Sequence, residues 1–132
     1  ACVRALAESG LPLALASSSR RAEIDLILHE IGIHEHFSVI ISSEDITKYK
    51  PDPEAYLACA HALGVAPEAC AAIEDSPVGI ASAKAAGCYA IAVPYAHESE
   101  ELSQADLIIT TLEELPARIQ ALRGLAHDQS PL

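Results

Sequence analysis

Short apolar runs alternate with amphipathic segments along the chain, and this alternation restricts the fold more than any other feature. Each amphipathic segment repeats apolar residues at helical spacing, as Ile24, Ile27, Leu28 and Ile31 do. The pattern predicts strands at 11–16, 39–41, 71–74, 89–93 and 107–110, and helices at 20–31, 53–63, 77–87, 99–105 and 116–124. Strands joined by helices require right-handed parallel crossovers. The predicted fold is therefore an open parallel, Rossmann-like, three-layer α/β/α sheet.

The chain has 132 residues, a length typical of one domain. We expect this domain to contain the end of a helix at 1–10, a core at 11–124 and a frayed tail at 125–132. The first segment resembles the second half of a helix that ends at Gly10, and the sequence contains no Met. We therefore expect the chain to be a piece of a longer protein.

The composition argues against several kinds of partner. Eight Lys and Arg against 19 Asp and Glu give a net charge of −11. This charge disfavours nucleic acids and anionic membranes, because both attract clustered positive charge. No apolar run approaches the roughly 20 residues that cross a bilayer. The four cysteines form no C-x-x-C pair, and we expect them to be reduced thiols in a cytoplasmic protein.

Polar residues follow the first three predicted strands, where ligands bind in open parallel sheets. They are Ser17–Ser19, Lys50 and the pair Glu74 and Asp75. Hydroxyl groups at the start of a helix suit a phosphate, and a lysine in a stiff proline-rich loop adds positive charge. Paired carboxylates suit Mg²⁺. Together these groups are the minimal set for Mg²⁺-dependent phosphoryl transfer.

Each of these groups also has a simpler interpretation. The serines could merely cap the following helix, which is the favoured interpretation for them alone. Lys50 could be a solvated side chain, as we expect Lys48 to be. Asp75 or Ser76 could cap the next helix, although two adjacent carboxylates repel each other unless they share a cation.

Three segments resemble motifs of a known family. LALASSS, YKPDPEAYLACAHALGV and IEDSPVGIASAKAAG are similar to the second, third and fourth motifs of the haloacid dehalogenase-like hydrolase superfamily. Within it, they are most similar to the branch of β-phosphoglucomutase-like and phosphoglycolate phosphatase-like enzymes. The resemblance extends from about Leu11 to Leu115, and the fourth motif is the most specific.

The resemblance implies roles for individual residues. Ser17 would bind the transferring phosphoryl group, and Lys50 would hold and neutralise it. Glu74 and Asp75 would position Mg²⁺, with Asp75 as the direct ligand. In the mutase-like members the residues after the motif-two serine bind a second phosphate of the substrate, and the corresponding residues here are Ser18 and Arg21.

The sequence departs from the family pattern in two ways. The residue before the motif-three lysine is usually small, whereas here it is Tyr49. The D-x-D motif that supplies the nucleophilic and acid/base aspartates is missing, and so is the helical cap that selects the substrate. The resemblance places the missing first strand between the strands at 11–16 and 71–74. We expect a missing N-terminal segment or another chain to complete the sheet, since unpaired strand edges promote aggregation. Direct pairing of these two strands would contradict this.

The predicted function is a Mg²⁺-dependent phosphatase that acts on a small phosphorylated metabolite through a phospho-aspartate intermediate. Because the nucleophile lies outside the sequence, we expect the chain alone to be inactive. A sugar phosphomutase of the same family and a non-catalytic core that binds only phosphate or a partner remain alternatives. A zinc site at His29, His34 and His36 is disfavoured because their spacing matches no common zinc pattern.

Overall fold

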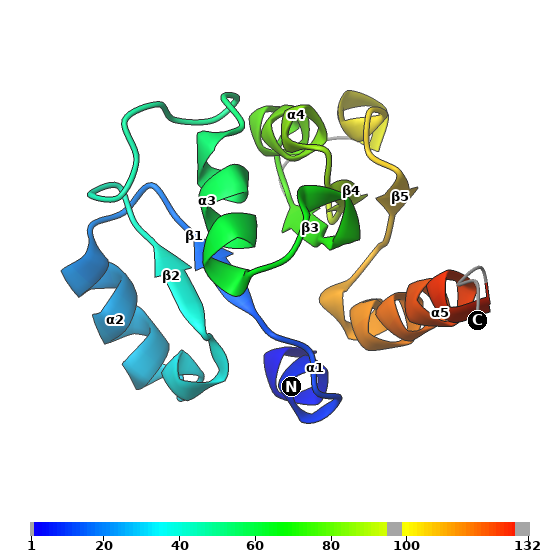
Figure 1. Ribbon diagram of the computed structural model, residues 1–132, viewed down its shortest axis with the longest axis horizontal. Coiled ribbons are helices and arrows are strands. Elements are labelled where there is room, and N and C mark those ends of the chain that lie inside the picture. The colour runs from blue at the N-terminus through cyan, green and yellow to red at the C-terminus, as the bar shows by residue number, and fades with distance from the viewer. Residues whose placement is uncertain (1, 95–98, 129–132) are drawn as a thin grey trace.

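The structure, a computed structural model, describes residues 2–94 and 99–128. Its helices and strands alternate as the sequence predicts (Figure 1). In chain order they are α1 (Cys2–Glu8), β1 (Ala14–Ala16), α2 (Arg21–Glu30), β2 (Val39–Ile41), α3 (Glu54–Leu63), β3 (Ala71–Glu74), α4 (Pro77–Ala86), β4 (Tyr89–Ala92), β5 (Leu107–Ile108) and α5 (Leu115–Asp128). Short 3₁₀ helices cover His34–His36, Pro67–Ala69, Ser99–Leu102 and Leu112–Glu114.

The strand pairings are parallel, which confirms the predicted fold class. β1 pairs with β2, and β4 lies between β3 and β5. Within residues 2–94 and 99–128, no strand hydrogen bonds connect the β1–β2 pair to the β3–β4–β5 sheet. β1 and β3 are therefore not paired directly. Direct pairing would have contradicted the prediction of an intervening strand. That strand itself stays a prediction.

Helices cover both faces of the β3–β4–β5 sheet. Ala90 and Ala92 of β4 pack in one cluster with Ile80 and Ala83 of α4. Ile91, which points to the opposite face, packs in a second cluster that includes residues of α1 and α5. This alternation makes β4 a strand buried on both faces, and it confirms the three-layer arrangement. A third cluster joins α2 to β2.

Helix α3 connects the two groups of strands. It contacts β1 and β2 as well as α4, and it lies between the two groups in the centre of the view (Figure 1). The buried hydroxyl of Ser82 on α4 donates a hydrogen bond of 2.7 Å to the backbone carbonyl of Asp52, just before α3. This packing fixes the loop that carries Lys50 relative to β3 and α4.

Several boundaries differ from those predicted. β1 covers only three residues rather than 11–16, because it is paired on one side only and Pro12 has no N–H to donate. α3 begins at Glu54, one residue after the predicted start. α5 continues past Gly124 to Asp128, so part of the predicted frayed tail is helical, and 129–132 lie outside the described residues. Among the residues that are described, no helix is long and apolar enough to span a membrane.

Candidate phosphoryl-transfer site

Lys50, in the loop between β2 and α3, meets Glu74 at the end of β3, although the two residues are distant in sequence. The Lys50 ammonium lies 2.5 Å from Oε1 of Glu74. The Glu74 side chain is only 9% exposed and that of Lys50 is 26% exposed. A pair shielded from water to this degree is screened weakly by salt, so it holds the lysine at a defined position. The Lys50–Pro51 peptide bond in this loop is cis.

Tyr56 completes this cluster, and the sequence did not single it out. Its hydroxyl donates to the same Oε1 atom of Glu74, and its ring lies 5.0 Å from the Lys50 ammonium. Burial, followed by the nearby charge of Glu74, raises the pKa of Tyr56 far above its ordinary value. The phenol therefore remains a hydrogen-bond donor. The sequence could have indicated this role, because Tyr56 is on the same helix face as the buried Cys59 and Ala60. A buried tyrosine hydroxyl needs a hydrogen-bond partner.

Gly79 makes room for the Glu74 carboxylate at the start of α4. A Cβ atom at position 79 would lie 2.0 Å from Oε2 of Glu74, so any side chain there would collide with the carboxylate. Ser76 is the N-cap of α4, and its Oγ accepts a 3.2 Å hydrogen bond from the Gly79 N–H. The capping role considered for Ser76 is thus confirmed. The carboxylate lies where the positive end of the helix dipole favours a negative charge.

Asp75 differs from Glu74 in its surroundings. Its side chain is exposed and has no hydrogen-bond or ion-pair partner among the described residues, whereas Glu74 is neutralised by Lys50. Within the same residues, no group of three or more His, Cys, Asp or Glu side chains is arranged to hold a metal. Mg²⁺ keeps several waters and takes only one or two carboxylates. Asp75 therefore fits such an ion as a single uncommitted ligand.

Ser17 follows β1 directly and does not cap α2. Its backbone N–H donates to the carbonyl of Ile41 at 3.0 Å, which extends the β1–β2 pairing. Its Oγ accepts from the Ser19 N–H at 3.1 Å, while the N-cap of α2 is Arg20, without a side-chain hydrogen bond. The simpler capping interpretation of the serines is therefore wrong for α2. Ser18 is exposed.

Arg21 is held at the first turn of α2 by acidic neighbours. Its Nε lies 3.0 Å from Oδ1 of Asp25, and its backbone N–H donates to Glu44 at 3.2 Å. The same Asp25 oxygen also contacts His34 at 3.0 Å. The hydrogen bond from Arg21, followed by that with His34, lowers the pKa of Asp25. Arg21 thus has an anchored Nε on an exposed side chain.

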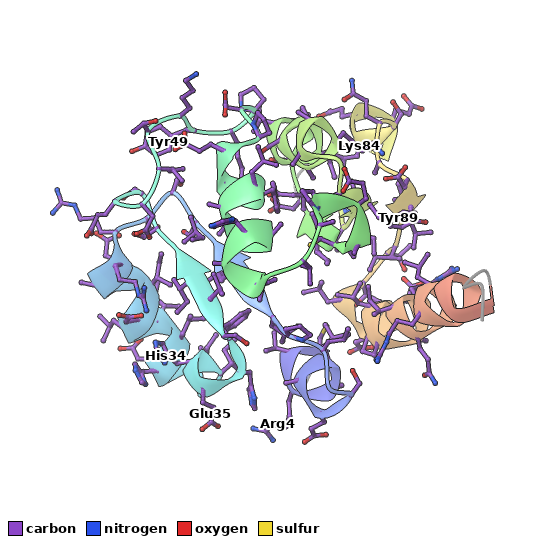
Figure 2. The ribbon with its side chains drawn as sticks, viewed as in Figure 1. Arg4, His34, Glu35, Tyr49, Lys84 and Tyr89 are labelled. Carbon is purple, nitrogen blue, oxygen red and sulfur yellow. The ribbon has the colours of Figure 1, made fainter. Side chains whose placement is uncertain are left out.

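The structure brings some of the predicted residues together and leaves others apart. Lys50 and Glu74 are in contact, while no described hydrogen bond links Ser17 or Asp75 to Lys50. The loop between β2 and α3 lies along the same edge of the molecule as α4 (Figure 1). Tyr49 lies on that loop (Figure 2) and is 53% exposed, so a large residue before Lys50 does not disturb the Lys50–Glu74 contact.

Comparison with known proteins shows which family the chain resembles. Residues 1–87 match the model of a family described as haloacid dehalogenase-like hydrolase. The chain is 33% identical over 110 residues to validoxylamine A 7'-phosphate phosphatase from Streptomyces hygroscopicus, covering 83% of the chain and 52% of that protein. It is 34% identical over 129 residues to phosphoglycolate phosphatase from Escherichia coli, covering 96% of the chain and 50% of the relative.

The fold also matches that of solved structures. One is β-phosphoglucomutase from Clostridium difficile, with a TM-score of 0.77 and 27% identity over 86% of this chain and 49% of that one. The chain thus spans about half the length of the relatives it matches.

Proposed function

Because the chain belongs to the haloacid dehalogenase-like hydrolase family, we propose that the whole protein is a phosphatase acting on a small phosphorylated metabolite. The observation that supports this most strongly is the 2.5 Å contact between Lys50 and Glu74, which fixes an ammonium group at the strand ends. Sequence relatives that are named as phosphatases support it as well. We place the protein in the cytoplasm, in keeping with its four free thiols.

Lys50 and Ser17 are the proposed contacts to the transferring phosphoryl group. A lysine about 4 Å from a phosphate oxygen contributes on the order of 4 kcal/mol at an effective dielectric constant of about 20. Glu74 and Tyr56 hold this lysine in place. The Oγ of Ser17 accepts from the Ser19 N–H, so its own O–H is left to donate to a phosphoryl oxygen.

Asp75 is the proposed direct ligand of Mg²⁺. Glu74, the second residue expected at the metal, already accepts hydrogen bonds from Lys50 and Tyr56 through Oε1. We therefore assign to Glu74 the orientation of Lys50, beside a metal held by Asp75. When bound, Mg²⁺ offsets negative charge on the phosphoryl oxygens.

The nucleophile must come from outside this chain. We propose that an upstream segment, or another chain, adds a strand between β1 and β3 and carries the aspartate that accepts the phosphoryl group. The lack of hydrogen bonds between these two strands in the described residues supports this proposal. The 132 residues alone would then have no phosphatase activity.

A sugar phosphomutase is the second candidate. The likeness to β-phosphoglucomutase favours it. Arg21 also favours it, because its guanidinium is anchored by Asp25 and the exposed Ser18 lies three residues earlier in the chain. These two residues could bind a second phosphate group of the substrate, as a mutase requires. The two candidates differ in product, because a phosphatase releases inorganic phosphate and a mutase returns an isomeric sugar phosphate.

The test is a screen of phosphorylated metabolites with the full-length protein, measuring phosphate release with and without Mg²⁺. We expect Lys50→Ala and Asp75→Ala each to lower kcat/KM by about 100-fold or more. Lys48→Ala removes the same charge two residues away and is the matched control, expected to retain activity. Full activity in both site variants would refute the assignment, and sugar phosphate isomerisation without phosphate release would favour the mutase.

A further inference from the structure

Cys70 and Cys88 lie side by side where β3 and β4 begin. The strands are parallel, with Ala71 opposite Tyr89. One step earlier in this register, Cys70 is opposite Cys88. The Tyr89 N–H donates to the carbonyl of Cys70 at 3.0 Å, so the two backbones are still paired at this point. Neighbouring strands are about 4.8 Å apart, and a disulfide needs Cα atoms about 4.4–6.8 Å apart.

Both thiols point to the same face of the sheet. Cys88 belongs to the cluster that contains Ala72 and Ala90, and Cys70 packs against that cluster. Side chains alternate between the two faces along each strand, and Ile73 of β3 and Tyr89 of β4 point to the opposite face, where they pack against the second cluster. In a parallel pair, residues that are opposite in register project on the same side. The side chains of Cys70 and Cys88 are therefore neighbours.

We propose that Cys70 and Cys88 are a site of reversible oxidation, where they form a disulfide across the start of the β3–β4 pair. Both thiols are free in the structure. Cys88 is only 3% exposed, whereas Cys70 is half-buried and is the thiol that an oxidant can reach. The bond would close a loop that contains β3 and α4, and with them Glu74 and Asp75.

The reaction needs an oxidant of the disulfide class, such as oxidised glutathione. The Cys70 thiolate attacks one sulfur of the oxidant, which forms a mixed disulfide and releases one reduced thiol. The Cys88 thiolate then attacks the Cys70 sulfur, and the second oxidant sulfur leaves as a thiolate that takes up a proton. The two cysteines are oxidised together, and one oxidant disulfide is reduced to two thiols.

The surroundings of the pair raise the pKa of both thiols, so they disfavour the reactive thiolate form. Burial, followed by the neighbouring Cys70, raises the pKa of Cys88 to about 11. Burial, followed by Glu68, raises the pKa of Cys70. Because the thiolate is the attacking species, the oxidation should be slow at neutral pH and should be studied under mildly alkaline conditions.

The experiment treats the purified, folded full-length protein with oxidised glutathione at about pH 8.5, where more thiolate is present. Non-reducing peptide mapping by mass spectrometry should show a peptide pair joined through Cys70 and Cys88, lighter by two hydrogen atoms and separated by dithiothreitol. Thiol titration should lose two of the groups contributed by these 132 residues. An unchanged thiol count, a bond between two protein molecules or a bond to Cys59 would overturn the proposal.

Variants test the order of the steps. Cys88→Ser should stop at the glutathione adduct on Cys70, because the second attacking thiol is gone. Cys70→Ser should leave Cys88 reduced, since Cys88 is buried. Cys2→Ser and Cys59→Ala are the matched controls and should still form the Cys70–Cys88 bond. A glutathione adduct on Cys70 as the final product of the unsubstituted protein would also contradict the proposal, and that measurement does not depend on how the variants fold.

Discussion

The hydroxyl of Tyr56 supports the site because it donates a hydrogen bond to the Glu74 oxygen that also binds Lys50, and its removal tests that role. Tyr56→Phe removes the donor and keeps the ring. Hydrogen bonds to charged groups contribute about 1.5–3 kcal/mol, so we expect a loss of about 2 kcal/mol in the free energy of unfolding, measured by urea denaturation. Tyr49→Phe removes the hydroxyl of an exposed tyrosine and should change little. Equal effects in the two variants would contradict the role of Tyr56.

Gly79 gives a second test. When it is replaced by alanine, the collision of the new Cβ with Glu74 lowers the stability of the protein, whereas the higher helix propensity of alanine raises it. Alanine in a helix is favoured over glycine by about 1 kcal/mol. At Gly79, however, the new Cβ would lie 2.0 Å from the Glu74 carboxylate. We therefore expect Gly79→Ala to destabilise the protein. Gly124→Ala in α5 should stabilise it, because an added Cβ there would meet no atom of another described segment within 4 Å. Thermal unfolding of both variants measures the difference, and stabilisation by both would show that Glu74 is not held against Gly79.

At the scale of elements, the start of the last helical segment depends on a capping box. Thr111 and Glu114 form it, and Glu114 also accepts hydrogen bonds from the side chain and the N–H of Thr110. These hydrogen bonds, the one from the Thr110 side chain first, lower the pKa of Glu114. Its contribution to stability is thus complete above the ordinary glutamate pKa and is lost as the pH falls through the lowered value.

We expect the free energy of unfolding of Glu114→Gln to fall less between neutral and acidic pH than that of the unsubstituted protein. The measurement is the free energy of unfolding at neutral pH and at about pH 3, below the ordinary glutamate range. Glu113→Gln removes the same charge from the neighbouring residue, whose carboxylate accepts none of the described hydrogen bonds. An identical pH dependence in Glu114→Gln and the unsubstituted protein would refute the assignment to Glu114.

For the whole molecule, the separation between β1 and β3 predicts how the chain behaves alone. Each of these strands has one edge without a strand partner in the described part of the chain, and such edges pair readily with other chains. We expect the 132-residue chain to self-associate as its concentration rises, while a longer protein with the intervening strand does not. Static light scattering over a concentration series measures this, and a concentration-independent mass for the shorter chain would contradict the proposal.

The sequence by itself determined the features that depend on residues close to one another along the chain. Strand and helix types, their order and the parallel class follow from the spacing of apolar residues. The caps at Ser76 and Thr111 were predictable for the same reason, because their hydrogen bonds span only two or three residues. Element ends were less predictable: α5 continues through Gly124, which a local rule treats as a terminator.

Only the tertiary structure decided what the charged groups contact. The two carboxylates predict a shared metal ion, and that stays a prediction, while the structure adds that Lys50, 24 residues away, contacts Glu74. Tyr56 reaches the same oxygen from α3, and the Cys70–Cys88 pair exists only because β3 and β4 align in one register. The two contacts of Glu74 depend on how α3 packs between β1–β2 and α4. Local spacing does not encode them, because they depend on the packing of segments that are distant along the chain.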